Sequence, residues 1–199
     1  EHNLVVRLVR DGFTDEVERM VIDDKKVFDE VSGFVGRLMP DLKDRVQLYR
    51  GPDPIYDTFG VEVEINKCTA QKVWLKSGGY LIIDQAEALT AIDVNSGKSR
   101  GQDTQEEMAY QTNVEAAEAA ARQLRLRDVG GLIVIDFIDM HENKHRRGVE
   151  RALKNALKRD KARSEVGRIS RFGLLEMSRQ RIKARLLSST HVSCPMCQG

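Results

Sequence analysis

The segment GLIVID, residues 131–136, constrains the fold of this chain more than any other. It is short, strongly apolar and rich in β-branched residues, and it begins at a glycine pair, so it predicts a buried strand of the parallel type. The Ala-, Glu- and Arg-rich residues 103–128 predict a long helix before it. A second helix, basic and with an apolar stripe at helical spacing, is predicted over residues 144–161. Helix, strand and helix in this order indicate a mixed α/β fold.

The two predicted helices have different terminal signals. Asp103 is a natural N-cap residue for the first helix, and Glu106 three residues later matches a capping box. The polar run over residues 111–113 marks the place where this helix would break. Asp139 lies shortly before the second helix and is predicted to cap it.

The remaining segments predict further strands and one more helix. Residues 69–95 alternate apolar and polar side chains, which predicts a three-stranded meander over 72–76, 80–84 and 89–95. The sequence pattern of residues 1–68 is typical of a βαβ unit. The elements predicted there are strands within 4–11, 15–23 and 45–51 and a helix over 24–39, and one or two closing strands are predicted within 166–181.

Composition and cysteine content exclude several classes of protein. With 41% hydrophobic and 32% charged residues, the chain is expected to be globular and soluble. No apolar run approaches the roughly 20 residues of a transmembrane helix, and the first residues lack the pattern of a signal peptide. The chain does not begin with Met and is expected to belong to a longer protein. Three cysteines do not make a disulfide framework, which favours the reducing cytoplasm, and Cys68 is expected to be a buried small hydrophobe.

Charge is distributed unevenly along the chain, although the formal net charge is only +1. Residues 141–185 contain fifteen Lys or Arg and five Asp or Glu, so this segment is strongly basic and the rest of the chain is acidic. Such asymmetry favours a polyanionic partner, and Arg163, Arg168 and Arg171 are candidate contacts to it. The alternative is a solvated helix face without a ligand.

Two carboxylates stand at the ends of predicted strands. Asp93 follows the strand LTAI, and Asn95 lies two residues further on, so both side chains share one face. Asp136 closes the strand GLIVI, where a carboxylate is costly to bury without a cation or a hydrogen-bond donor. On neighbouring strands the two aspartates would form a Mg²⁺ site with few protein ligands. The alternative is that each aspartate caps the turn or helix that follows it.

Four sequence blocks indicate a family. ALTAIDVNSG, ARQLRLRDVGGLIVIDFIDM, RFGLLEMSRQR and the final CPxCxG occur in this order and resemble the catalytic core of the bacterial ribonuclease E/G family. The resemblance implies a partial ribonuclease-H-like subdomain over 1–68, a deoxyribonuclease-I-like catalytic subdomain over 69–189 and a zinc-link over 190–199. The family's OB-type RNA-binding domain and 5′-phosphate sensor precede these blocks and lie outside the chain. The chain is therefore expected to be a catalytic fragment, and the alternative is a non-catalytic RNA-binding or assembly module.

The resemblance also implies roles for single residues. Asp93 and Asp136 correspond to the family's two Mg²⁺-binding aspartates, and Asn95 corresponds to its active-site asparagine. Arg163 corresponds to an arginine that supports the docking of the 5′-end-sensing region. Arg168 and Arg171 are added from the basic segment, so Arg163, Arg168 and Arg171 are predicted to support RNA or the 5′ sensor.

The residues favour metal-dependent cleavage of RNA over the metal-free route. A metal-free nuclease uses the 2′-hydroxyl with a base and an acid, usually two histidines. The histidines of this chain are His2, His141, His145 and His191, and none is predicted at a strand end beside another candidate. A bound metal instead activates water and neutralises phosphate charge. We expect an endoribonuclease that cuts single-stranded RNA to 5′-phosphate and 3′-hydroxyl ends, and the resemblance places it in RNA processing and mRNA decay. A Mg²⁺ phosphoesterase of small substrates is a further alternative.

The C-terminal CxxC supplies only half of a structural zinc site. Cys194 and Cys197 are clustered, whereas Cys68 is distant in sequence and His191 would add only a third ligand. A structural Zn²⁺ takes four ligands, so two chains sharing one ion through four thiolates is the simplest solution. The resemblance implies the same homodimer, because the zinc-link of the family joins two protomers, and it implies a dimer of dimers for the full-length enzyme. The alternative is a disordered CxxC that binds no metal.

Overall fold

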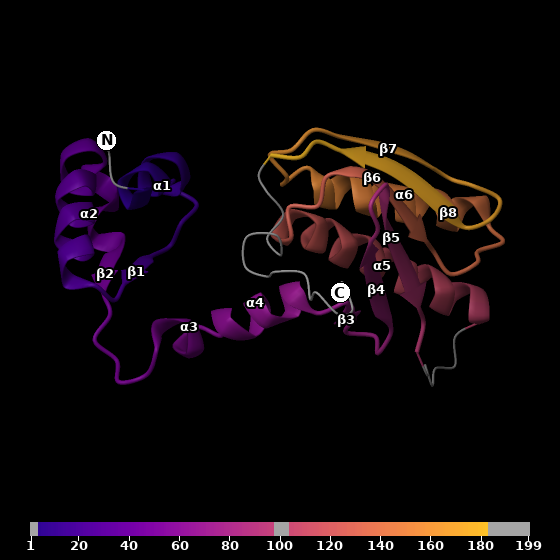
Figure 1. Cartoon of the computed structure of the whole chain (residues 1–199), viewed down its shortest axis with the longest axis horizontal. Coiled ribbons are helices and arrows are strands. Elements are labelled where there is room, and N and C mark those ends of the chain that lie inside the picture. Colours follow the sequence, from indigo (N-terminus) through magenta and orange to yellow (C-terminus); the bar gives the residue numbers. More distant parts are fainter. Residues whose placement is uncertain (1–3, 98–103, 183–199) are drawn as a thin grey trace. The chain divides into compact units, whose positions relative to one another are not determined.

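The computed structural model describes residues 4–97 and 104–182, and the chain divides into two compact units, Glu1–Val63 and Glu64–Gly199 (Figure 1). Each unit has a hydrophobic core of its own. No helix in the described parts of the chain is long and apolar enough to cross a membrane. Helices and strands both occur along the chain, which is a mixed α/β protein, as the sequence predicts.

The first unit contains the predicted βαβ arrangement. Its elements are α1 (Leu4–Gly12), β1 (Met20–Ile22), α2 (Lys25–Leu38), the 3-10 helix η1 (Pro40–Arg45), β2 (Val46–Leu48) and α3 (Ile55–Thr58). β1 and β2 pair in parallel. Asp24 caps α2, because its side chain accepts a hydrogen bond from the backbone N–H of Val27 (2.9 Å). Val31 and Val35 of α2 are buried in the core of this unit.

The start of the chain is helical, so the strand predicted within residues 4–11 is wrong. Val6, Val9 and Phe13, which are spaced three and four residues apart, are all buried. This spacing places Val6 and Val9 on one face of α1, and Phe13, one residue beyond its end, continues that face through the hydrogen bond from its N–H to the carbonyl oxygen of Val9. The helical periodicity of the apolar side chains therefore outweighs the strand preference of the valines.

The second unit is built on a six-stranded sheet. Its strands and helices are β3 (Lys72–Trp74), β4 (Tyr80–Gln85), β5 (Leu89–Asn95), α5 (Gln105–Leu126), β6 (Gly131–Asp136), α6 (Asn143–Leu157), β7 (Ser164–Ile169) and β8 (Leu174–Arg179), and α4 (Val61–Thr69) leads into them. The strand order is β3-β4-β5-β6-β8-β7. β5 and β6 are parallel, and the other neighbouring strands are antiparallel.

In the described part of the chain, helices α5 and α6 cover one face of this sheet (Figure 1), and side chains of the other face, such as Asp93, Leu132 and Asp136, are exposed. On β5, Ile92 and Val94 are buried while Asp93 between them is exposed. On β6, Ile133 and Ile135 are buried, whereas Leu132 is 48% exposed. β6 is therefore buried on one face only, in contrast to the two-sided burial that its apolar sequence suggests.

Helix α5 is continuous and differs from the prediction at two points. Its N-cap is Thr104, whose side chain accepts a hydrogen bond from the N–H of Glu107 (3.2 Å), and Asp103 lies outside the described residues. No break occurs over residues 111–113, because Thr112 and Asn113 face the interior and are buried. Small side chains let α5 pack closely, and the buried alanines are Ala109, Ala116, Ala117, Ala120 and Ala121.

Candidate active site at the ends of the parallel strands

Asp93 and Asp136 lie side by side on the two parallel strands. In the register of β5 and β6, Asp93 is the partner of Asp136. Partnered residues of neighbouring strands point to the same face, and both aspartates are exposed on the face that the helices leave open. Asn95 shares this face, and its Nδ2 donates a hydrogen bond to Oδ2 of Asp93 (2.8 Å). The structure thus brings together the three residues that the sequence selects.

Negative charge is concentrated at this edge of the sheet. Burial, and then the neighbouring carboxylates of Asp93 and Asp139, raise the pKa of Asp136 above its usual value. Among residues 4–97 and 104–182, no three His, Cys, Asp or Glu side chains are grouped as a metal site. Two carboxylates still suit Mg²⁺, which keeps several waters and binds phosphate oxygens in its other positions. The carboxylate ligands and the concentration of negative charge therefore fit Mg²⁺.

Gly173 keeps space open beside the acidic side chains. A Cβ at this position would lie 3.0 Å from the carbonyl oxygen of Phe137, 3.4 Å from Oδ1 of Asp139 and 3.7 Å from Oδ1 of Asp136. The φ angle of Gly173 is +80°, which a residue with a side chain rarely adopts. The β7–β8 turn therefore approaches the carboxylates of Asp136 and Asp139 through backbone atoms, without a side chain between them.

Asn113 fixes the loop that follows β6, and the sequence analysis did not select it. Its side chain is fully buried on α5. Nδ2 donates to the carbonyl oxygen of Ile138 (2.7 Å), and Oδ1 accepts from the N–H of Ile138 (3.0 Å). Ile138 lies between Asp136 and Asp139, so this paired contact holds the acidic loop against α5. The signal in the sequence for this role was a polar residue on the helix face that is buried.

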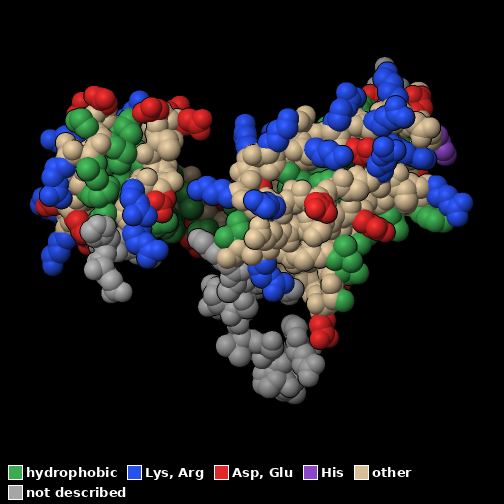
Figure 2. Space-filling view, turned by 90° about the horizontal axis from the view of Figure 1, so that it is seen from above, with side chains coloured by type: hydrophobic (Ala, Val, Ile, Leu, Met, Phe, Trp, Pro, Cys, Tyr) green, Lys and Arg blue, Asp and Glu red, His purple; other side chains and the backbone are tan. Residues whose placement is uncertain are grey.

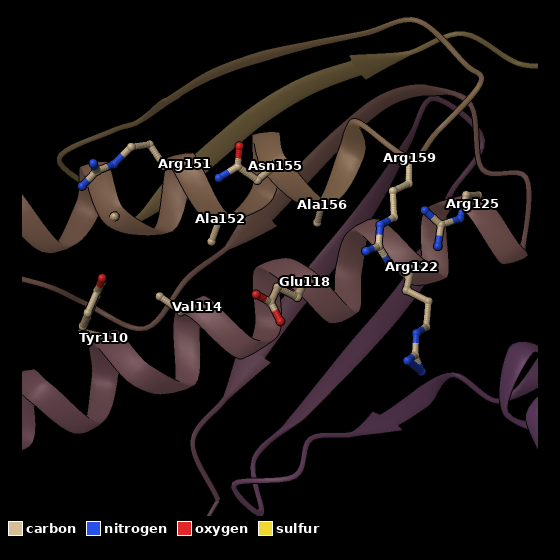
Figure 3. Close-up of a pocket in the computed structure, with 11 residues that line it drawn as sticks. Tyr110, Val114, Glu118, Arg122, Arg125, Arg151, Ala152, Asn155, Ala156 and Arg159 are labelled. Carbon is tan, nitrogen blue, oxygen red and sulfur yellow. The ribbon is translucent and has the colours of Figure 1, made fainter. Parts of the chain in front are cut away.

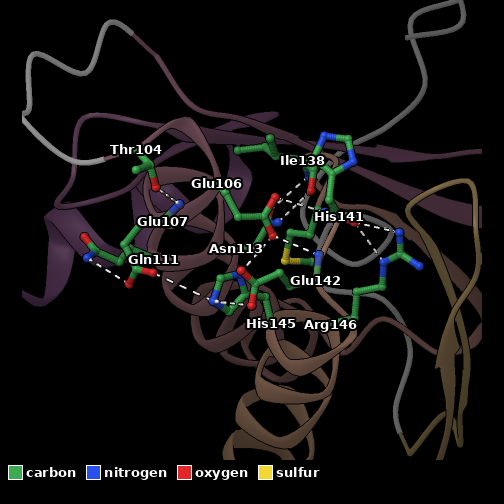
Figure 4. Close-up of polar contacts among 11 residues, drawn as sticks. Thr104, Glu106, Glu107, Gln111, Asn113, Ile138, His141, Glu142, His145 and Arg146 are labelled. Atoms are coloured by element: carbon green, nitrogen blue, oxygen red, sulfur yellow. Dashed lines mark hydrogen bonds and ion pairs between the residues drawn. The ribbon is translucent and has the colours of Figure 1, made fainter.

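Glu106 of α5 binds the backbone just before α6 (Figure 4). Its carboxylate accepts hydrogen bonds from the N–H groups of His141 (2.9 Å) and Glu142 (3.1 Å), and it contacts Nδ1 of His145 at 2.9 Å. These bonds lower the pKa of Glu106 to about 2, with the His141 N–H as the largest cause. The capping prediction for Asp139 is wrong, because Glu142 occupies the N-cap position of α6 and its side chain makes no capping hydrogen bond.

Helix α6 and the end of β7 line a strongly basic groove, and Figure 2 shows Lys and Arg side chains gathered over the second unit. The cations of this basic groove are Lys144, Arg146, Arg147, Arg151, Lys154 and Arg168. Glu150 is the acid in its lining, and it accepts a hydrogen bond from the N–H of Ile169 (2.9 Å). Within the described part of the chain, Lys144, Arg147, Lys154 and Arg168 form no ion pair. Their charge is therefore available to an external anion.

A second hollow lies between α5 and α6 and is also basic (Figure 3). Arg122 and Arg125 reach it from α5, and Arg151 and Arg159 reach it from α6 and the residues just after it. Glu118 is the acidic residue in its lining. Arg151 lines both hollows, so positive charge is continuous across the helical face of the unit.

The three predicted arginines occupy different places. Arg163 is exposed just before β7, and its carbonyl oxygen accepts a hydrogen bond from the N–H of Gln180 (2.8 Å). Arg168 lines the basic groove. Arg171 lies in the β7–β8 turn, with its guanidinium 4.7 Å from the centre of the Phe172 ring. The structure does not gather them into one cluster.

The predicted zinc ligands Cys194 and Cys197 lie outside the described residues, as does His191. Cys68 is buried, as predicted, and burial raises the pKa of its thiol. The shared zinc site therefore stays a prediction.

These features define an α/β protein with an acidic strand-end site on one face of its sheet and a basic helical layer on the other. The model of the ribonuclease E/G family matches residues 1–182, so the chain belongs to this family. The family resemblance that the sequence blocks suggested is thereby confirmed, and the final CPxCxG lies beyond the matched residues.

Curated relatives carry both names of the family. The chain is 48% identical over 200 residues to ribonuclease E of Haemophilus influenzae and 47% identical over 201 residues to ribonuclease E of Escherichia coli K12, covering 100% of this chain and 21% and 19% of those proteins. It is 43% identical over 199 residues to ribonuclease G of Haemophilus influenzae, covering 40% of that protein. The chain thus spans about a fifth of the ribonuclease E relatives and two fifths of the ribonuclease G relative.

Proposed function

We propose that this chain is the catalytic part of a Mg²⁺-dependent endoribonuclease that cuts single-stranded RNA and leaves 5′-phosphate and 3′-hydroxyl ends. The proposal rests above all on the register that places Asp93 opposite Asp136. Membership of the ribonuclease E/G family supports RNA as the substrate and RNA processing and mRNA decay as the setting. Within this proposal the subdomains are ribonuclease-H-like over 1–68 and deoxyribonuclease-I-like over 69–189.

Asp93 and Asp136 would hold Mg²⁺ through carboxylate oxygens. When bound, the ion supplies charge neutralisation at the scissile phosphate and activation of water. The Nδ2 of Asn95 orients the Asp93 carboxylate by the 2.8 Å hydrogen bond. Asn113 positions the loop of Asp136 through its two bonds to Ile138. The residues of the chain therefore orient two acidic ligands on a rigid sheet edge.

The cations of the helical layer would hold the RNA backbone. Phosphate contacts of Lys and Arg provide affinity without sequence preference. Arg168 belongs to the basic groove, and Arg171 lies in the turn next to Gly173, so they are proposed as RNA contacts. Arg163 is proposed to support the 5′-end-sensing region, on the family resemblance.

The test uses 5′-labelled single-stranded RNA with the 199-residue chain, with and without Mg²⁺. We expect Mg²⁺-dependent products with 3′-hydroxyl ends, and loss of cleavage by at least about 100-fold in Asp93→Asn and Asp136→Asn, as for other groups that act on the transition state. Asp84→Asn is the matched control, because Asp84 is exposed on the same sheet face two strand positions from Ile82, the partner of Asp93. Cleavage by Asp136→Asn at the normal rate would refute the proposed metal site.

The second candidate function is RNA binding and assembly without cleavage. The observation that favours it is the basic groove, most of whose free cations lie on α6, on the side of the sheet opposite to Asp93 and Asp136. The same assay decides between the two functions. Retention of RNA without any Mg²⁺-dependent product would support the binding module.

Cys194 and Cys197 are proposed to bind one Zn²⁺ shared by two chains. A four-thiolate structural site predicts about half a zinc per chain in a homodimer. Removal of zinc with a strong chelator, or Cys194→Ser, should then give monomers in measurements of solution mass. One zinc per chain in a monomer, or a dimer that neither treatment affects, would rule out the shared site.

A further inference from the structure

An exposed aromatic pair with a lysine lies at the outer strands of the sheet. Trp74, the single tryptophan of the chain, is 66% exposed at the end of β3. It packs edge-to-face on Tyr80 of β4, with ring centres 5.4 Å apart. The Nζ of Lys72 lies 4.1 Å from the centre of the Trp74 ring and 3.6 Å from the centre of the Tyr80 ring. The three side chains form one unit, called here the Trp74 platform.

Strand register places the platform on the same face as the candidate active site. Trp74 is the partner of Tyr80, and Tyr80 is the partner of Asn95. Lys72 is in turn the partner of Ile82, which is the partner of Asp93. Neighbouring strands are about 4.8 Å apart, so the backbone of β3 lies roughly 10 Å from that of β5. A nucleotide next to the scissile one can span this distance.

The hairpin that carries the platform is held firmly against β5 and α5. The Glu115 carboxylate of α5 accepts hydrogen bonds from the N–H groups of Lys76 and Ser77 in the turn. Burial raises the pKa of Glu115, but the hydrogen bonds from Ser77 and Lys76 outweigh it, and the pKa lies below its usual value. A Cβ on Gly79 would lie 2.6 Å from the carbonyl oxygen of Asn95, so only glycine permits this approach. The position of the platform relative to Asn95 is therefore fixed.

The chemistry of the platform suits a nucleobase better than a protein surface. An aromatic ring in an apolar interface would pack against apolar groups, whereas the Trp74 ring has an ammonium group over it. Nucleobases stack on aromatic rings, and a lysine beside the ring can contact the adjoining phosphate. The platform also adjoins a site whose proposed substrate is RNA. We propose that Trp74, Tyr80 and Lys72 bind a base of single-stranded RNA next to the cleaved phosphate; this inference rests on the proposed function.

The single tryptophan allows a direct test by fluorescence. The 199-residue chain is titrated with a single-stranded RNA oligonucleotide in EDTA, so that no cleavage occurs. We expect quenching of Trp74 emission by RNA and none by inorganic polyphosphate, which has the charge without the bases. Equal quenching by polyphosphate would overturn the proposal. So would a blue-shifted emission that acrylamide cannot quench in the absence of RNA, because the platform would then be covered by protein.

Variants test the contribution to affinity. Trp74→Ala should weaken RNA binding by about 5- to 100-fold, the effect of losing one stacked base, and Trp74→Phe should restore most of it. Leu132→Ala is the control, because Leu132 is 48% exposed on the same face but lies at the other end of β6. Melting temperatures of the variants show whether each one folds. A folded Trp74→Ala chain that binds RNA like the unchanged chain would refute the platform.

The outcome separates the platform from the proposed function. Cleavage in Mg²⁺ without quenching in EDTA would refute the platform and leave the nuclease proposal intact. Quenching without cleavage would refute the nuclease proposal and support the platform as an RNA-binding site.

Discussion

At the residue scale, Asp136 is a side chain whose charge is unfavourable for folding. Burial and then the Asp93 and Asp139 carboxylates raise its pKa, so the folded state disfavours the ionised form. This destabilisation is present above the folded-state pKa and disappears as the pH falls below it. A site that gives up stability in this way is typical of function rather than of helix capping.

We therefore predict that Asp136→Asn stabilises the metal-free chain at pH 7. The gain should be roughly 0.5 kcal/mol, discounted for the screening of a partly exposed carboxylate. Thermal unfolding in EDTA at pH 7 and pH 3 measures it, and the difference from the unchanged chain should shrink at the lower pH. A lower melting temperature at pH 7 would instead indicate that Asp136 is a structural cap.

Ionisation of Glu106 stabilises the folded state, in contrast to ionisation of Asp136. Its pKa of about 2 lies below the unfolded value of about 4.3, so it contributes stability above pH 4.3 that is lost as the pH falls toward 2. We predict that Glu106→Gln lowers the stability to urea at pH 7 and that the difference from the unchanged chain disappears near pH 2. Glu118→Gln, exposed on the same helix, should change stability little at either pH. A pH-independent loss in Glu106→Gln would contradict the role of the ionised carboxylate as acceptor for the N–H groups that precede α6.

The role of a single residue could be predicted where it depends on the local sequence pattern. It could not be predicted where it depends on a tertiary contact. Asp93, Asn95 and Asp136 stand at strand ends, a position that alternation and apolar runs reveal. Glu106 matches a capping box in spacing, yet its carboxylate binds N–H groups 35 and 36 residues away. Rules that relate residues a few positions apart cannot predict hydrogen-bond partners this far away in the sequence.

At the element scale, the loop between β6 and α6 depends on one buried amide. Asn113→Ala would leave the N–H and C=O of Ile138 without their side-chain partners. We predict a loss of roughly 1–3 kcal/mol in the free energy of unfolding, the cost of unsatisfied buried polar groups. Gln111→Ala on the exposed side of α5 is the control and should cost less than about 0.5 kcal/mol.

The same variant also tests how the loop serves the candidate site. A loosened loop should raise the Mg²⁺ concentration needed for half-maximal cleavage, because Asp136 is no longer held in place. A stability loss with an unchanged Mg²⁺ dependence would limit Asn113 to a structural role.

Elements with a clear period were predicted well, and their arrangement was not. The meander became β3, β4 and β5 because alternation at a period of two is an unambiguous strand signal. The helix α1 shows the reverse, since a valine-rich segment follows the helical spacing of its buried side chains. The placement of β8 between β6 and β7 depends on long-range pairing that no local pattern reports.

At the scale of the whole molecule, the sheet of the second unit separates two kinds of charge. Carboxylates occupy the exposed face at the ends of β5 and β6, and most free cations of the basic groove lie on α6, on the other side of the sheet. The basic sequence segment predicted a concentration of positive charge but not its place in the fold, which follows because α6 is amphipathic and buries its apolar stripe against the sheet. Under the proposed function, an RNA held by these cations and cut at the carboxylates would contact both faces of this unit.

The last prediction follows from this separation. Binding of single-stranded RNA should weaken with salt, and each lost phosphate contact should reduce the slope of log affinity against log salt by about 0.7. Arg147→Gln, Lys154→Gln and Arg168→Gln each remove one cation of the basic groove, and we expect a reduced slope with little change in melting temperature. Lys26→Gln, an exposed cation on α2 of the first unit, is the control. If the slope stays constant while the melting temperature falls, the groove is a solvated helix face and RNA is held elsewhere.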